Sequence, residues 1–414
     1  MSCLKIVQHT TNFGTCMPGI QPDGKEFCTV AACCIFAANP DFSKPGIFVQ
    51  NRLYTLICCL FLTQFPFSGT SQPGEQTPVD FQIAAHYGFF MANQPKAYYL
   101  QTSHTRMLEF TASKRTTGNR QWEAENSLPT IGLSGLISDL GSKEYLGKMA
   151  ALFPFVHFPL KRSKNSITTF RLGTGVGWVE KPFDKNTNYK NLMIGSHLNA
   201  VISLKLQQEW KLSDQLYANL AIGFTHLSNG AMKLPNLGLN IPTLSVGTRY
   251  QSKTGTIPFT KRQLRRDKHI DLTILGSFAL KQTYPLEHRA HLVKLVTAEV
   301  SKFLSPVSSF TAGVTCAYDP SLSKEITFVQ AYEFDKSELQ MQASVFAGYE
   351  HHVGKISFPV QLGTYVYNNY KASSLYQVIG VRYHWSPKWF AAVQLKAHFG
   401  KADYIQSGIA YKIS

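Results

Sequence analysis

Residues 216–228, LYANLAIGFTHLS, alternate between apolar and more polar side chains with a repeat of two. A repeat of two is that of a β-strand, in which successive side chains point to opposite faces. His226 and Ser228 therefore share a face with the apolar residues at 216, 218, 220, 222 and 224. The pattern predicts a strand whose apolar face ends in a candidate base and a candidate nucleophile, two residues apart.

The same alternation recurs along the chain, for example at 194–207 and 339–348. We expect sixteen strands from residue 79 onward. Eight lie within 79–251 and eight within 268–414, and the polar segment from Lys253 to Asp267 separates the two sets. A short similarity between residues 169–174 (TFRLGT) and 359–364 (PVQLGT) suggests that the second set is a degenerate repeat of the first.

The strands have the length and composition of membrane strands. After about residue 70 no apolar run approaches the ~18 to 20 residues of a spanning helix, and the predicted strands exceed the ~5 to 6 residues usual in soluble sheets. Aromatic residues stand near strand ends, as in the aromatic girdles of membrane barrels: Trp178, Trp210, Tyr250, Trp385 and Trp389. We predict an all-β protein, a transmembrane antiparallel β-barrel. A soluble β-sandwich or lipocalin-like barrel is the alternative.

The sixteen strands can close in two ways. One barrel of sixteen strands is the architecture we expect, because every membrane edge strand must be paired and added hairpins enlarge a barrel without requiring a second closure. The alternative is two tandem barrels of eight strands each.

The first 71 residues differ from the remainder. Seven of the eight cysteines precede residue 60, so the later part contains only Cys316. Arg52, the apolar run 53–67 and the small residues 68–71 resemble a secretory signal peptide that begins unusually late. We predict a leader and signal-like region over 1–71 that is removed; a disordered extension or a single membrane anchor is the alternative.

A second motif follows the His–Ser pair. His226-x-Ser228-Asn229 leads into Lys233-x-Pro235-Asn236-x-Gly238, and residues 153–156 (FPFV) and 173–177 (GTGVG) precede it. Over about residues 79–251 this combination resembles the outer-membrane lipid A 3-O-deacylase family, which is acyloxyacyl hydrolase-like. The resemblance implies a serine esterase that removes the ester-linked acyl chain at the 3 position of lipid A.

The resemblance assigns a role to each matched residue. It implies that His226 is the general base and Ser228 the nucleophile. On chemical grounds we expect Asn229, the Asn236 side chain and backbone N–H groups near Gly230 to contact the oxyanion or substrate. Asn240 stands where the family usually has a glutamate that orients the histidine. An amide can hold the imidazole tautomer, but it does not stabilise the imidazolium as a carboxylate does. Lys233 contacts a lipid phosphate or is a solvated loop charge.

The resemblance and the charge also indicate partners and location. Lys and Arg exceed Asp and Glu by 41 to 25, which suits a surface dense in phosphate such as lipopolysaccharide. We expect lipid A and outer-membrane lipids as partners, the outer membrane as location with the site toward the outer leaflet, and no metal, no cofactor and no nucleic acid. A homodimer is left open. The alternative function is a non-catalytic channel or structural barrel with a degenerate motif.

Overall fold

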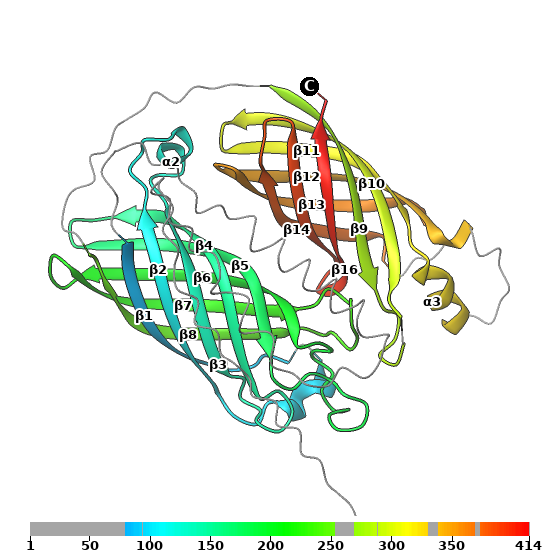
Figure 1. Ribbon diagram of the computed structural model, residues 1–414, viewed down its shortest axis with the longest axis horizontal. Coiled ribbons are helices and arrows are strands. Elements are labelled where there is room, and N and C mark those ends of the chain that lie inside the picture. The colour runs from blue at the N-terminus through cyan, green and yellow to red at the C-terminus, as the bar shows by residue number, and fades with distance from the viewer. Residues whose placement is uncertain are drawn as a thin grey trace, which may run out of the picture. The chain divides into compact units, whose positions relative to one another are not determined.

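The computed structural model describes residues 79–92, 94–252, 269–287, 289–329, 338–368 and 373–413. The predicted leader over 1–71 lies outside the described residues. Sixteen strands form two closed antiparallel barrels of eight strands each (Figure 1). The first barrel consists of β1 (Val79–Gly88), β2 (Thr105–Arg115), β3 (Thr130–Asp139), β4 (Lys148–Arg162), β5 (Ser166–Val179), β6 (Leu198–Lys211), β7 (Leu216–Ser228) and β8 (Leu239–Tyr250).

The second barrel follows the same order of strands. It consists of β9 (Ile270–Lys281), β10 (His291–Ser305), β11 (Ser308–Tyr318), β12 (Met341–Val353), β13 (Ile356–Asn368), β14 (Leu375–His384), β15 (Trp389–His398) and β16 (Lys401–Lys412). Short helices occupy some connections: η2 (Pro95–Leu100), α2 (Gln121–Glu125), α3 (Ser321–Val329) and η3 (Glu338–Gln340).

The number of strands is as predicted, but the expected single closure is wrong. β1 pairs with β8, from Phe81 opposite Tyr250 to Gly88 opposite Thr243, and β9 pairs with β16. The physical reason lies in the interior, where buried charged side chains from opposite walls meet directly. They can meet only across the narrow lumen of a small barrel, whereas sixteen strands would enclose an aqueous channel. The alternative of two tandem barrels is therefore correct.

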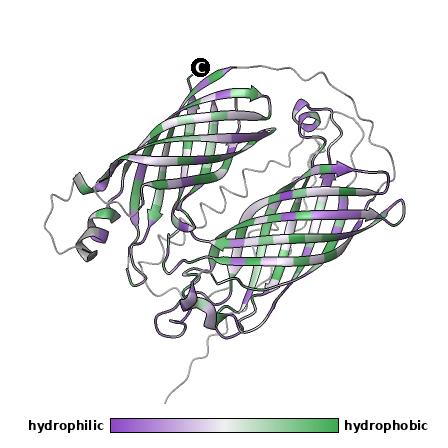
Figure 2. Ribbon diagram, turned by 180° about the vertical axis from the view of Figure 1, so that it is seen from behind, coloured by the Kyte–Doolittle hydropathy of each residue, from purple (hydrophilic) through white to green (hydrophobic). Residues whose placement is uncertain are grey.

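The strand alternation sorts side chains into an apolar exterior and a polar interior, as predicted. On β7, Leu220 and Ile222 point outward and are 40% and 66% exposed, while Asn219 and Thr225 point inward and are buried. Figure 2 shows hydrophobic and hydrophilic positions alternating along the strands of both barrels. Exposed apolar walls of this kind identify transmembrane barrels. In the described parts of the chain, no helix is long and apolar enough to cross a membrane.

The two ends of the first barrel differ in their connections. Residues 163–165 and 212–215 make short turns at the end where β1 starts and β8 stops, and α2 lies in the third connection there, 116–129. Longer connections join the strands at the opposite end, over 89–104, 140–147, 180–197 and 229–238. We call these the short-turn end and the long-loop end. Short turns at one end and long loops at the other are typical of outer-membrane barrels.

The lumen of the first barrel is filled in layers. At the long-loop end, buried apolar side chains from strands and connections form a plug, which includes Phe90, Leu100, Leu140, Leu146, Phe153, Met193, Ile194, Leu227, Leu239 and Ile241. Gly177 permits this packing, because a Cβ there would lie 2.7 Å from Val201 and 2.9 Å from Leu227. Below the plug, buried Glu109 of β2 binds Arg171 of β5 at 2.5 Å, His86 of β1 at 3.0 Å, and Lys205 of β6.

The second barrel repeats the central ion pair. Glu299 of β10 receives two hydrogen bonds from Arg382 of β14, at 2.6 and 2.8 Å, and one from Gln361 of β13 at 2.8 Å. In each barrel the acid is thus on the second strand and a cation is on the sixth. Gln361 occupies the place of Arg171 in the two similar sequences, and both residues donate to that acid from a fifth strand. This correspondence supports the predicted duplication.

Candidate active site

His226 and Asn240 are directly paired across β7 and β8. They are register partners, and the Nδ1 atom of His226 lies 2.7 Å from Oδ1 of Asn240. Both side chains are on the outward face, since Ile222 of β7 and Leu244 of β8 have the same parity and are 66% and 54% exposed. An amide oxygen accepts, so Nδ1 carries the proton in this bond and Nε2 is left with its lone pair.

Ser228 ends the same face of β7. Its Oγ accepts a hydrogen bond from Nδ2 of Asn236 at 2.9 Å and another from the backbone N–H of Gly230 at 3.1 Å. Because the hydroxyl accepts two bonds, its own proton remains to be donated. Within the described residues no hydrogen bond joins His226 to Ser228; bonds of this kind are often longer in a protein without substrate.

The connection 229–238 holds these donors in place. Asn229 acts as a clamp: its Nδ2 donates to Oγ of Ser196 and to the carbonyl of Lys233, both at 2.8 Å, and its backbone N–H donates to Oδ1 of Asn236 at 3.2 Å. The side chain of Asn229 is therefore engaged with the loop, whereas Asn236 and Gly230 contact Ser228.

Gly238 closes the loop against the histidine. Its backbone has φ +77°, a left-handed conformation that glycine adopts without steric cost. A Cβ at this position would lie 2.8 Å from Cε1 of His226. The N–H of Gly238 donates to the carbonyl of Met193 at 2.9 Å, which ties this loop to the connection 180–197.

The loops around the site are positively charged. Lys233 is exposed beside the 180–197 connection, which also carries the exposed or half-buried lysines 181, 185 and 190. Backbone N–H groups of Thr187 and Asn186 hold the pKa of the Asp184 carboxyl below its usual range, and the charge of Lys233 lowers it further. Lys233 is thus close enough to the neighbouring loop to act on its charges.

The predicted residues fall into two groups. His226, Ser228, Gly230, Asn236 and Asn240 lie together at one outward-facing rim, in a set that contains a base, a hydroxyl and two hydrogen-bond donors. Asn229 supports them from the loop. Ser196 was missed by sequence reasoning, because its contact with Asn229 spans 33 residues and no local spacing reveals it.

A second cluster lies inside the second barrel. Each of Glu350, His352 and His384 offers one atom that could bind a metal ion. These three atoms lie within 4.8 Å of one another. Glu350, however, already pairs with Arg382 at 2.8 Å, and His384 is hydrogen-bonded to Ser357 at 2.9 Å. The adjacent guanidinium opposes a cation, so this cluster is better explained as part of the lumen network.

The fold and the rim together define a transmembrane β-barrel that carries a polar cluster of hydrolase type on its lipid-facing wall. Residues 108–249 match the family described as lipid A 3-O-deacylase (PagL), and residues 268–414 match the acyloxyacyl hydrolase C-terminal domain. The first half of the chain therefore belongs to the lipid A 3-O-deacylase family, as its sequence suggested. Membership implies a hydrolase with lipid A as its substrate.

Comparisons with curated proteins and with solved structures do not extend this assignment. No curated protein matches the chain. Solved structures with some similarity include a triple mutant of the Rhodopseudomonas blastica porin, at 8% identity over 82% of this chain and 100% of that one, with a TM-score of 0.16. Another is the KdgM porin, at 7% identity over 80% of this chain and 99% of that one, also with a TM-score of 0.16. TM-scores this low carry no argument.

Proposed function

We propose that this protein is an outer-membrane serine esterase that removes the ester-linked acyl chain at the 3 position of lipid A. The observation that carries the proposal is the 2.7 Å bond between His226 and Asn240 on the lipid-facing wall, beside a serine held by two donors. An ester in a membrane leaflet can reach only a nucleophile that projects sideways from a barrel. This rim meets that requirement.

The first half-reaction forms an acyl-enzyme. Ser228 Oγ attacks the acyl carbonyl carbon, and Nε2 of His226 takes the hydroxyl proton. The N–H of Gly230 and Nδ2 of Asn236 stabilise the negative charge that develops on the carbonyl oxygen. When the bond to the sugar 3-oxygen breaks, His226 returns the proton to that oxygen and lipid A leaves with a free hydroxyl.

The second half-reaction releases the fatty acid. His226 takes a proton from water, the resulting hydroxide attacks the acyl-enzyme, and the proton returns to Ser228 Oγ as the ester bond breaks. Asn240 keeps Nδ1 protonated throughout, so that Nε2 is the basic atom. Because an amide carries no charge, it stabilises the imidazolium less than the glutamate usual in the family.

The orientation of the barrel supports the choice of substrate. If β1 begins in the periplasm, β7 runs outward and Ser228 lies at the outer leaflet, where lipopolysaccharide resides. The exposed Lys233 and the lysines of the 180–197 connection then face the lipid A phosphates.

Asn240 also motivates a second candidate, a structural barrel with a degenerate site. The lost carboxylate is the observation that favours it. A channel function is less well supported than a structural one, because the apolar plug and the Glu109 network fill the lumen of the first barrel.

Mass analysis of lipid A incubated with the purified full chain tests the proposal. We expect loss of one 3-linked acyl chain with the parent protein and no loss with Ser228→Ala. Ser213→Ala is the matched control, since Ser213 is exposed in the 212–215 turn at the other end of the barrel. Intact lipid A after incubation with the folded parent would favour the structural candidate, and turnover by folded Ser228→Ala would reject the nucleophile.

A further inference from the structure

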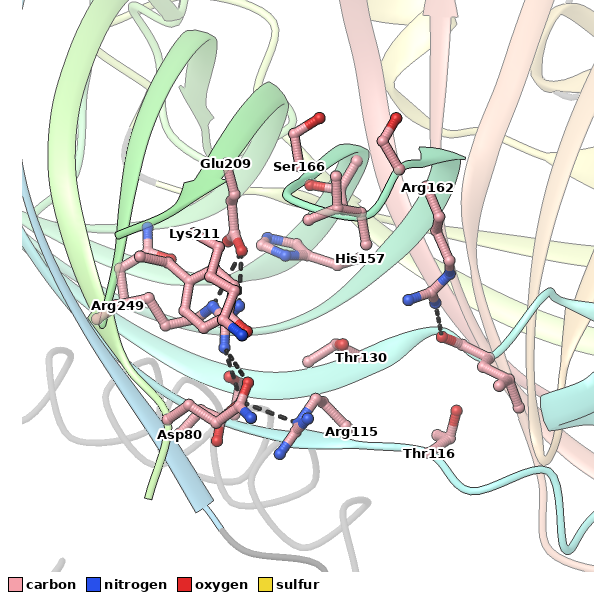
Figure 3. A pocket seen from close by; sticks show the side chains of 18 of the residues that line it. Asp80, Arg115, Thr116, Thr130, His157, Arg162, Ser166, Glu209, Lys211 and Arg249 are labelled. Atoms are coloured by element: carbon pink, nitrogen blue, oxygen red, sulfur yellow. Dashed lines mark hydrogen bonds and ion pairs between the residues drawn. The ribbon is translucent and has the colours of Figure 1, made fainter. Parts of the chain in front are cut away.

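A cavity of about 610 Å³ lies inside the first barrel at its short-turn end (Figure 3). The inward residues of β2 show how it is separated from the candidate active site. They run from Met107 in the apolar plug, through the buried Glu109, to Thr111, Ser113 and Arg115 at the cavity. The reaction proposed above uses none of these groups, so the cavity needs an explanation of its own.

Positive side chains outnumber carboxylates around the cavity. Five cations line it, namely Arg115, Arg162, Lys164, Lys211 and Arg249, against the two carboxylates of Asp80 and Glu209. Both carboxylates are engaged: Arg249 contacts Asp80 at 3.0 Å and Glu209 at 2.8 Å, and Arg115 contacts Asp80 at 3.2 Å. The cations that contact neither carboxylate are Arg162, Lys164 and Lys211, which are exposed at the mouth.

The mouth offers a cation that is not neutralised. Lys164 lies in the exposed turn 163–165, and within the described residues it has no ion-pair partner. Lys211, by contrast, pairs with the exposed Asp214 at 2.7 Å. Lys164 can therefore bind an incoming anion without first breaking an existing ion pair.

The deep wall offers polar atoms without partners. His157 is only 7% exposed and lines the cavity, and its Nε2 has no hydrogen-bond partner among the described residues. The buried Oγ1 of Thr169 also has no hydrogen-bond partner among the described residues. Figure 3 shows the His157 ring among the cavity-lining side chains. Buried polar groups are normally satisfied, so these atoms indicate that something hydrogen-bonds to them when the cavity is filled.

We propose that this cavity binds a small hydrophilic anion, a sugar-sized molecule that carries a phosphate or a carboxylate. Lysine and arginine at the mouth bind the anionic group. Serine, threonine, asparagine and glutamine side chains on the wall bind its hydroxyls, and His157 provides a deeper contact. The volume falls within the ~300 to 1,000 Å³ of small-molecule sites. A lining this polar does not suit an acyl chain.

Calorimetric titration of the full chain in detergent micelles tests the proposal. The probes are glucose 6-phosphate and glucuronate, with neutral glucose for comparison. We expect at least one anionic sugar to bind with a dissociation constant below about 1 mM and glucose to bind at least tenfold more weakly. The tighter of the two anions tells whether a phosphate or a carboxylate is preferred.

Variants locate the site. Lys164→Gln should weaken anion binding by about tenfold, the effect of losing one charge-assisted bond, and should leave lipid A deacylation unchanged. Lys96→Gln, an exposed lysine at the long-loop end, is the matched control and should bind as the parent does. His157→Gln, which keeps a hydrogen-bonding side chain, should also weaken binding. Absence of saturable binding, equal affinity for glucose, or parental affinity in Lys164→Gln would overturn the proposed anion site.

Discussion

Replacing Asn240 by glutamate should raise the rate of lipid A deacylation about fivefold to tenfold. The Oδ1 atom of Asn240 already accepts from Nδ1 of His226 at 2.7 Å, so a carboxylate oxygen can occupy nearly the same place. A hydrogen bond to a neutral partner contributes about 0.5–1.5 kcal/mol and one to a charged partner about 1.5–3 kcal/mol. The gain arises when the imidazolium forms, and a difference of about 1–1.5 kcal/mol corresponds to the predicted acceleration.

Two further substitutions separate charge from position. Asn240→Ala removes the acceptor and should lower the rate by about tenfold or more, because the imidazole tautomer is no longer fixed. Asn240→Asp adds charge on a side chain one methylene shorter than glutamate. It should give a gain at least as large as that of Asn240→Glu, since its side chain has the length of the amide and keeps a carboxylate oxygen at the place of Oδ1, 2.7 Å from Nδ1 of His226.

The assay is the initial rate of acyl release from lipid A in detergent micelles, followed by mass analysis. Folding is checked by the change in gel mobility on heating, because Asn240 is only 9% exposed and a new carboxylate there costs desolvation free energy. A folded Asn240→Glu protein that is no faster than the parent would refute the charge argument. Parental activity in Asn240→Ala would show that the 2.7 Å bond has no part in catalysis.

Four other outcomes are expected. His226→Gln should lower the deacylation rate by ~10²- to 10⁴-fold, the usual contribution of a general base. Gly238→Ala should reduce activity in a folded protein, because its Cβ would displace the histidine; unchanged kinetics would contradict the close approach at 2.8 Å. Glu109→Gln should destabilise the first barrel by about 3 kcal/mol or more in urea unfolding, since it leaves buried cations unpaired, whereas the exposed Glu144→Gln should have little effect. Residues 79–252 expressed alone should form a heat-modifiable barrel, and failure to do so would show that the first closure depends on the remainder.

Much of the fold could be predicted because alternation is a local property. Leu220, Ile222 and His226 share a face through the strand repeat alone, and sixteen such segments can be counted without knowing their partners. Closure is different. Whether β8 meets β1 or β9 depends on contacts between strands far apart in sequence, and Glu109 meets Lys205 across 96 residues. No local sequence pattern specifies a contact between residues so far apart in the chain.

The candidate site divides in the same way. The position of Asn240 beside His226 follows from parity and from the antiparallel pairing of consecutive strands, and the structure pairs the two residues directly. The clamp of Asn229 on Ser196 and the engagement of Asn236 with Ser228 could not be predicted, because loop geometry is set by hydrogen bonds that carry no periodic signal. The cavity at the short-turn end could not be predicted from the sequence either, since it is bounded by residues from many different strands.

Separate closure of the two strand sets also divides the cooperativity of the chain. Each backbone ladder is complete within its own eight strands, so neither set requires the other for its strand pairing. Unfolding then need not be a single all-or-none transition, and one free energy of unfolding does not describe the whole chain. Substitutions that weaken strand pairing after residue 268 can therefore leave intact the ladder that supports His226 and Ser228.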